Sequence, residues 1–346
     1  MRFGMFIPQG WRMDLVGIPA AQHWGVMAGL ARAADANNMW ESIWLHDHFR
    51  TVPEATHEPT HEAWTLTAAL AAVTGRVRLG QMSTTMGYRN PVLLAKMAAT
   101  VDIISEGRLD VGLSAGWYEE EWLAYGYGFP SAGERIGMLA EGVEILRQAW
   151  TTGTVTFKGR HYNAENAIVA PRPLQGTLVT GSPANGIPMC IAGGGEKKTL
   201  RLAAQHADYT NFEGTAEKFA HKTNILTRHC TDVDRDPATI TRTATYTVIV
   251  GTDLTDLNER LRAIGNRMVE GGITQTQAHA QVEQLRAQPL VGTPDKICDY
   301  LDEMRAIGLD YAIAYFPEAA YDSTGLELFE HYVIPEFRPR KRMRLL

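Results

Sequence analysis

Cysteine is scarce in this chain: there are three among 346 residues, Cys190, Cys230 and Cys298, without CxxC spacing. This argues against a disulfide framework or a cysteine-based zinc site and favours a reducing compartment. An apolar run of about 18 residues, long enough to span a bilayer, is also missing. The chain passes from Arg2 directly into a strand-like segment, without a signal-peptide pattern. We therefore expect no membrane partner and a cytoplasmic location.

The chain has no excess of basic residues, because 33 Lys and Arg face 39 Asp and Glu, a formal net charge of −6. Nucleic-acid binding needs a basic surface, so we expect no nucleic-acid partner. Basic residues cluster only within 335–346, which predicts a solvated tail. With 45% apolar and 21% charged residues the composition is globular, and we expect residues 1–346 to form a single domain.

Short β-prone segments alternate along the chain with helical stripes of apolar residues, the pattern of βα units. Eight segments predict strands: Arg2–Pro8, Ser42–His46, Val77–Thr84, Arg108–Ser114, Pro188–Ala192, Ala207–Phe212, Ala244–Gly251 and Asp310–Phe316. Several are almost continuously apolar, as parallel strands covered on both faces are. The sequence therefore predicts an α/β protein with an eight-stranded parallel β/α (TIM) barrel.

Residues 154–187 break this alternation. They show no helical period, are rich in Pro and Gly, and are too long for a routine connection. We expect an insertion before strand 5, built as a small hairpin and a loop over the site.

His57-Glu58-Pro59-Thr60-His61 matches the zinc motif HExxH, which needs both histidines on one helical turn. Pro59 pushes the residue before it out of the helical region, so we expect a loop. The sequence predicts no metal site.

Gly112-Leu113-Ser114-Ala115-Gly116 matches the nucleophile elbow GxSxG after a strand. An elbow also requires an immediate helix and an upstream oxyanion loop, and neither pattern is present. A serine hydrolase that uses Ser114 is therefore a lesser hypothesis.

A run of three glycines, Gly193–Gly195, follows an apolar strand and precedes Glu196–His206, which has a helical pattern. Glycine amides that converge on a helix N-terminus form an anion site, and Lys197 and Lys198 add positive charge. The pattern favours a phosphate cradle over a plain tight turn.

His46-Asp47-His48 ends the second predicted strand, where the active sites of β/α barrels lie. His48 can exchange protons near neutral pH, and Asp47 can orient a ring. Alternatively, the histidines only cap the next loop. Glu119, Glu120 and Glu121 follow the fourth strand and fit a site or a solvated helical turn.

Several segments together resemble the bacterial-luciferase-like superfamily of flavin and deazaflavin oxidoreductases, and more closely its branch that uses coenzyme F-420, an 8-hydroxy-5-deazaflavin. The similar segments are PQGWRMDLVG, SIWLHDHF, VRLGQMSTTMGYRNPVLLAKMAATVDIISEGRLDVGLSAGWYEEEW, YGYGFP and IAGGGEKKTLRLAAQHAD. They cover most of the chain to about residue 236, and their order and spacing carry the resemblance.

The resemblance implies a flat ring in the barrel mouth, backed by a bulged third strand that often contains a non-proline cis peptide. It implies cofactor contacts from Asp47, Gln81, Met82, Ser83, Thr84, Ala192, Gly193, Gly194 and Gly195. Deazaflavin sugar-phosphate dehydrogenases of this superfamily carry a catalytic glutamate where this chain has Trp117. The candidates for catalysis are therefore His48, Asp47, Glu121 and Tyr118, and those for the substrate pocket are Trp64, Tyr88 and Trp117.

We therefore expect an oxidoreductase that moves a hydride between C5 of the deazaflavin and a small-molecule or peptide-like substrate, reducing an activated C=C or C=N bond. The alternative is a monooxygenase of the same superfamily that uses reduced FMN. A cofactor-binding barrel without turnover is a further alternative. The resemblance also implies a homodimer.

Overall fold

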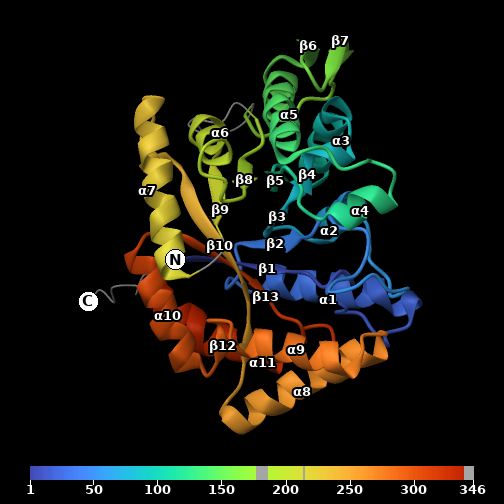
Figure 1. Cartoon of the computed structure of the whole chain (residues 1–346), viewed down its shortest axis with the longest axis vertical. Coiled ribbons are helices and arrows are strands. Elements are labelled where there is room, and N and C mark those ends of the chain that lie inside the picture. Colours follow the sequence, from blue (N-terminus) through green and yellow to red (C-terminus); the bar gives the residue numbers. More distant parts are fainter. Residues whose placement is uncertain (177–185, 213–214, 339–346) are drawn as a thin grey trace.

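The computed structural model describes residues 1–176, 186–212 and 215–338, which form a closed barrel of parallel strands surrounded by helices (Figure 1). The strand order is β3-β2-β1-β13-β10-β9-β8-β5, and pairing of β3 with β5 closes the barrel. The barrel strands are β1 (Arg2–Phe6), β2 (Ser42–Leu45), β3 (Arg78–Gln81) with its continuation β4 (Thr84–Thr85), β5 (Leu109–Ser114), β8 (Met189–Ala192), β9 (Tyr209–Phe212), β10 (Thr241–Thr247) and β13 (Tyr311–Tyr315). The predicted eight-stranded barrel is confirmed.

The seventh predicted strand, Ala244–Gly251, is two strands. β10 ends at Thr247, and the chain then leaves the barrel to form β11 (Ile249–Val250), which pairs with β12 (Val291–Gly292) in a separate sheet. Ile249 is buried there against Leu257 and Val291. A continuous apolar run gives no sign of this change of partner.

The barrel helices bury the apolar stripes that the sequence predicts. On α5, for example, Leu139, Val143 and Leu146 face the core. The helices are α1 (Ala20–Ala36), α2 (Ala63–Val73), α3 (Pro91–Ile104), α4 (Glu119–Ala124), α5 (Ala132–Thr152), α6 (Thr199–His206), α7 (Ala216–Asp232), α8 (Leu254–Glu270), α9 (Gln275–Arg286), α10 (Pro294–Ala306) and α11 (Thr324–Leu328). Within the described residues, none of these helices has the length and apolarity to cross a membrane.

Side chains fill the inside of the barrel. Trp44 lies at its centre, and glycines at positions 4 and 80 leave room for the indole, because a Cβ at either one would overlap it. Phe6, Tyr311 and Ile313 belong to the same buried cluster. The barrel is therefore a packed core, and a ligand can enter only at a strand end.

The third strand is bulged, as the resemblance implies. Gly80 pairs with Asp110 but Thr84 pairs with Leu113, so the third strand holds one more residue than its neighbour. The Met82–Ser83 peptide bond inside the bulge is cis. A Cβ on Gly112 of β5 would overlap the carbonyl oxygen of Gln81, so the bulge requires a glycine there.

The predicted insertion 154–187 contains the expected hairpin, β6 (Thr154–Lys158) and β7 (Asn163–Ile168). It packs along α5, where the Glu141 carboxylate accepts hydrogen bonds from the backbone N–H groups of residues 160–162. Figure 1 shows the hairpin beside α5 at the edge of the molecule. The loop expected over the site includes 177–185, which lie outside the described residues.

The segment predicted as a solvated tail, 335–346, begins as part of the core. Ile334–Phe337 forms a short 3-10 helix in which Phe337 is buried, with its ring 6.0 Å from that of Phe3. The tail therefore starts at about Arg338, and residues 339–346 lie outside the described residues.

Candidate active site

His46, directly after β2, lies in the barrel mouth. Its ring stacks on Phe6 at 4.1 Å, and Nδ1 lies 3.2 Å from the carbonyl oxygen of Met82. Burial, together with the nearby charges of Arg12 and His48, holds the pKa of His46 well below its ordinary value. The ring is therefore neutral, and Nδ1 donates to Met82. Nε2 is thus a buried acceptor, and it has no partner among the described residues.

Asp47 does not orient a histidine, the role predicted for it. Its side chain is fully buried, and the two Nη atoms of Arg89 lie 2.7 and 2.9 Å from its two oxygens. The backbone N–H of Thr85 donates to the same carboxylate at 3.0 Å. These contacts join the end of β2 to β4 and the turn that follows it, so Asp47 holds the bulged strand in place.

Glu121 is the partner of His48. Oε2 of Glu121 lies 3.0 Å from Nδ1 of His48, and Oε1 accepts the backbone N–H of Phe49 at 2.7 Å. Burial raises the pKa of Glu121, but hydrogen bonds from His48, Phe49 and Tyr88 outweigh burial and lower the pKa below its ordinary value. Glu121 is therefore ionised at neutral pH, whereas Glu119 and Glu120 are exposed.

The His48–Glu121 pair is held by rings on several sides. Trp11 stacks on His48 at 4.2 Å, and Tyr118 approaches it edge-on at 6.1 Å. The Tyr88 hydroxyl donates to Glu121 at 2.8 Å, and burial beside that carboxylate raises the pKa of Tyr88. Because Nδ1 of His48 faces Glu121, Nε2 is the nitrogen available to a ligand.

The three predicted pocket residues lie in different places. Trp117 is 64% exposed at the rim, 6.0 Å from the ring of His48 and 5.1 Å from that of Tyr118. Trp64 is buried and donates to the hydroxyl of Thr84, so it supports the bulge from behind. Tyr88 is buried against Glu121, and only Trp117 lines the cavity described below.

The four residues of the third strand that were predicted to contact the cofactor have different surroundings. Gln81 is buried and donates to Thr67 of α2, and the hydroxyl of Thr84 accepts from Trp64, so both side chains serve the packing around the strand. Met82 belongs to the cluster inside the barrel, and Ser83 is half-buried. The side chains of Gln81 and Thr84 thus contact α2, and the binding of a cofactor by these four residues stays a prediction.

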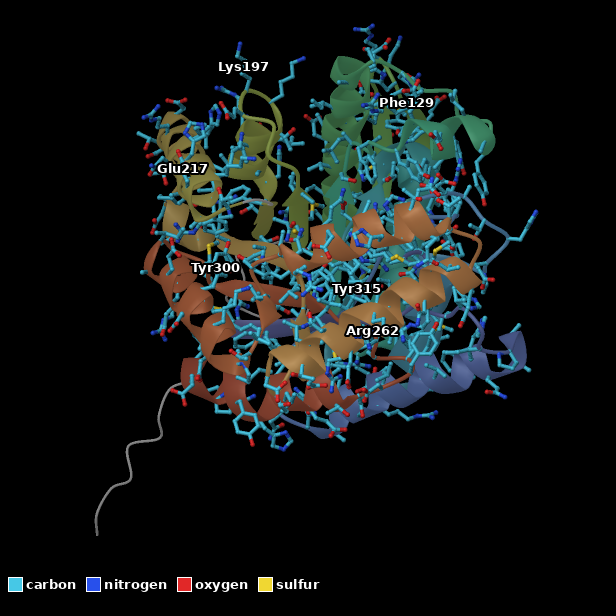
Figure 2. All side chains as sticks on the ribbon, turned by 60° about the horizontal axis from the view of Figure 1, so that its bottom comes forward. Phe129, Lys197, Glu217, Arg262, Tyr300 and Tyr315 are labelled. Atoms are coloured by element: carbon cyan, nitrogen blue, oxygen red, sulfur yellow. The ribbon has the colours of Figure 1, made fainter. Side chains whose placement is uncertain are left out.

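The glycine run follows β8 as predicted, and Ala192 is the last residue of that strand. Gly193 has φ +118°, which favours glycine. Helix α6 begins at Thr199, three residues later than predicted, because 196–198 form a turn. Lys197 is exposed and points outward in Figure 2. The cation beside Gly194 is instead Lys222 of α7, which pairs with Glu196 at 2.5 Å.

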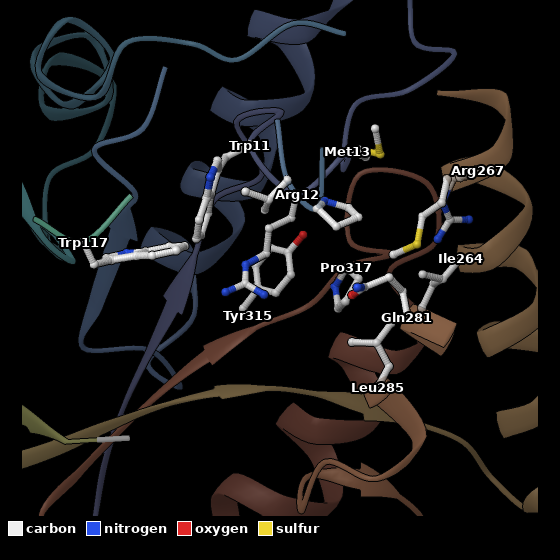
Figure 3. Close-up of a pocket in the computed structure, with 13 residues that line it drawn as sticks. Trp11, Arg12, Met13, Trp117, Ile264, Arg267, Gln281, Leu285, Tyr315 and Pro317 are labelled. Carbon is white, nitrogen blue, oxygen red and sulfur yellow. The ribbon is translucent and has the colours of Figure 1, made fainter. Parts of the chain in front are cut away.

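A cavity of about 260 Å³ opens at Trp11 and Trp117, the two indole rings that lie next to His48 (Figure 3). Trp11, Trp117 and Tyr315 line one part of it, and Arg267 and other residues of α8 and α9 line another. The sequence did not predict that α8 and α9 line this cavity. The two helices follow β11, which lies outside the alternating strands and helices of the barrel, and they carry no catalytic motif.

The segments that match HExxH and GxSxG do not have the local structure that these motifs require. Residues 57–61 form no helix, and His61 instead contacts His23, with ring nitrogens 3.1 Å apart. Among the described residues no cluster of His, Cys, Asp or Glu could hold a metal ion. Ser114 lies within β5, and the next helix, α4, begins only at Glu119, so the strand–turn–helix of a nucleophile elbow is missing here.

Comparison with known proteins identifies the family. A family model described as luciferase-like monooxygenase matches residues 1–311. The pyrimidine monooxygenase RutA of Acinetobacter baylyi is 27% identical over 270 residues, 71% of this chain and 69% of that protein. RutA of Pseudomonas syringae pv. syringae is 32% identical over 183 residues, which cover 49% of this chain and 48% of the relative.

Solved structures share the fold over nearly the whole chain. The monooxygenase RslO1 from Streptomyces bottropensis superposes with a TM-score of 0.76 at 21% identity, covering 98% of this chain and 100% of its own. A secondary alcohol dehydrogenase dependent on F420 superposes with a TM-score of 0.75 at 18% identity, covering 98% and 99%. The chain belongs to the luciferase-like monooxygenase family.

Proposed function

We propose that this protein is a monooxygenase that uses reduced FMN and O₂ to oxidise a small organic molecule. The observation that carries the proposal is the likeness to the pyrimidine monooxygenases, which extends over 71% of the chain. On this support we favour the FMN alternative over hydride transfer with coenzyme F-420, which the resemblance of the sequence segments implied.

The barrel mouth has features that fit a flavin ring. Nε2 of His46 is a buried acceptor without a partner in the described ranges, and such an atom is costly unless a ligand or water donates to it. The bulge contacts the other ring nitrogen, because the carbonyl oxygen of Met82 lies 3.2 Å from Nδ1, and Ser83 follows Met82 in the bulge. A ring N–H at Nε2 would satisfy the acceptor, with the bulge behind the ring.

The glycine run fits the phosphate of FMN. Its residues carry no side chains that would keep a phosphate from the backbone N–H groups, and Lys222 lies beside Gly194. The N–H of Gly193 already donates to the carbonyl oxygen of Asn211 at 3.3 Å. We therefore propose Gly194 and Gly195 as the phosphate-binding residues, with Lys222 as the nearby cation.

When bound, reduced FMN would supply the two electrons that let one atom of O₂ enter the substrate and the other leave as water. In this scheme Nε2 of His48 holds or delivers a proton in the mouth. Glu121, 3.0 Å from Nδ1, fixes the orientation of the imidazole. Buried Trp11 stacks on His48 and shields that face of the imidazole from water.

Hydride transfer with coenzyme F-420 is the second candidate. The sequence segments that resemble the deazaflavin branch, among them YGYGFP and IAGGGEKKTLRLAAQHAD, favour it. A deazaflavin presents a similar flat ring and anionic tail, so the same residues would serve.

Cofactor titration and oxygen dependence distinguish the two candidates. We expect reduced FMN to bind more tightly than reduced F-420, and substrate turnover to stop in anaerobic buffer. Tight binding of F-420 only, with turnover that needs no O₂, would contradict the proposal. The His46→Phe variant provides a control for the ring site, because it removes the acceptor Nε2 and keeps a flat ring next to Phe6. We expect weaker FMN binding in this variant.

A further inference from the structure

The cavity at Trp11 and Trp117 has a charge pattern that the proposed reaction alone does not explain. Two guanidinium groups, those of Arg12 and Arg267, line it, and no carboxylate from the described part of the chain does. The rest of the lining is aromatic or aliphatic apart from the amide of Gln281. A small-molecule site of this kind positions its ligand through a few polar groups. Here those polar groups select an anion.

Arg267, on α8, has unused hydrogen-bond donors. Its guanidinium carbon lies 4.3 Å from the ring centroid of Tyr321, which fixes the position of the group. Nη2 is buried and has no hydrogen-bond partner within the described part of the chain. The neighbouring carboxylate, Glu318, pairs with Arg260 at 3.0 Å. An acceptor from a ligand would satisfy the buried donor of Arg267.

Arg12 is held over aromatic rings in the same cavity. Its guanidinium carbon lies 4.6 Å from the ring centroid of Trp11 and 5.3 Å from that of Tyr315. Among the described residues Arg12 forms no ion pair, and stacking leaves the edge of its guanidinium free to donate. Figure 3 shows Trp117 and Arg267 at opposite ends of the cavity, with Arg12 and Tyr315 between them.

We propose that this cavity binds a planar organic carboxylate as the substrate of the enzyme. The carboxylate lies at Arg267, and the conjugated part lies toward Trp11 and Trp117, next to His48. Arg12 donates to a second oxygen of the ligand. A volume of about 260 Å³ suits a molecule of one or two rings. The inference rests on the proposed function for the reaction, but binding at the cavity is measured independently of turnover.

Paired ligands test the charge requirement. Benzoate, trans-cinnamate and orotate, each with its carboxamide, are titrated into the full chain by calorimetry, with and without FMN. We expect at least one carboxylate to bind on the order of tenfold more tightly than its amide, with an affinity that falls as NaCl is raised. Equal binding of the amides, or no binding of any carboxylate, overturns the inference.

Arginine variants locate the anion. Arg267→Gln is expected to weaken carboxylate binding by about 10–100-fold, the loss typical of a charge-assisted hydrogen bond. Arg262→Gln is the matched control, because Arg262 is exposed on the same helix (Figure 2) and does not line the cavity. Arg267→Lys keeps the charge and is expected to recover part of the affinity. Equal effects of Arg267→Gln and Arg262→Gln contradict the assignment.

The cofactor's own anionic group is the competing source of negative charge. We expect FMN to bind Arg267→Gln as it binds the wild type, and loss of FMN binding in that variant would overturn the inference. If FMN binds the wild type and the carboxylates do not, this inference fails and the proposed function stands. If the carboxylates bind and FMN does not, the proposed function fails alone.

Discussion

Nδ1 of His48 lies 3.0 Å from Oε2 of Glu121, and this contact joins the loop after β2 to α4 at the barrel mouth. Glu121 also accepts from Phe49 and Tyr88, so three donors fix its position. The pair gives the mouth an oriented imidazole with Nε2 facing away from the carboxylate.

Glu121→Gln is expected to lower kcat by about 100-fold while the protein stays folded, because an amide has one acceptor oxygen where the carboxylate has two and no longer holds the imidazole in place. The pH profile of kcat is expected to change with it. Glu120→Gln is the matched control, since Glu120 is exposed and its ion-pair partner among the described residues is Arg50. Equal activities of the two variants would remove the pair from the mechanism.

Asp47→Asn is expected to affect stability more than chemistry. The substitution breaks the two-pronged contact with Arg89, which keeps Glu62 as a carboxylate partner at 2.6 Å, and it is expected to cost about 2 kcal/mol of unfolding free energy. Chemical denaturation measures this loss. Activity per folded molecule is expected to stay within a few-fold of the wild type. Full stability combined with loss of activity would restore the catalytic role predicted from the sequence.

Glu318 makes the stability pH-dependent. Burial raises its pKa to about 7, although Arg260 opposes the shift. The folded form therefore binds a proton more tightly than the unfolded form, and the stability this contributes is lost as pH rises from about 4.5 to 7. Relative to Glu318→Gln, the wild type is expected to lose about 2 kcal/mol of unfolding free energy between pH 5 and 8. A constant difference across this range would contradict the raised pKa.

Gly112→Ala is expected to disturb the bulged strand, because the new methyl group would overlap the carbonyl oxygen of Gln81. We expect a loss of about 2 kcal/mol in stability together with weaker flavin binding. In Gly29→Ala, on α1, the methyl group meets nothing within 4 Å, and stability is expected to stay or rise. If Gly112→Ala keeps both its stability and its affinity for flavin, binding of the flavin ring does not depend on the bulged strand.

The strands and helices of the barrel follow from local patterns, so the sequence predicts them. It also places His48 and Glu121 at strand ends. Their pairing depends on how α4 turns back over the mouth, which spacing does not reveal. Asp47 illustrates the same limit, because its partner Arg89 lies beyond the third strand. The α8–α9 wall depends on β11 leaving the barrel, and an apolar run such as residues 248–250 does not signal it.

The most direct test of the account is the fate of oxygen when the enzyme turns over its substrate with reduced FMN under ¹⁸O₂. We expect a product heavier by one ¹⁸O atom and no product without O₂. A product without ¹⁸O, formed equally in anaerobic buffer, would contradict oxygen insertion and return the protein to hydride transfer.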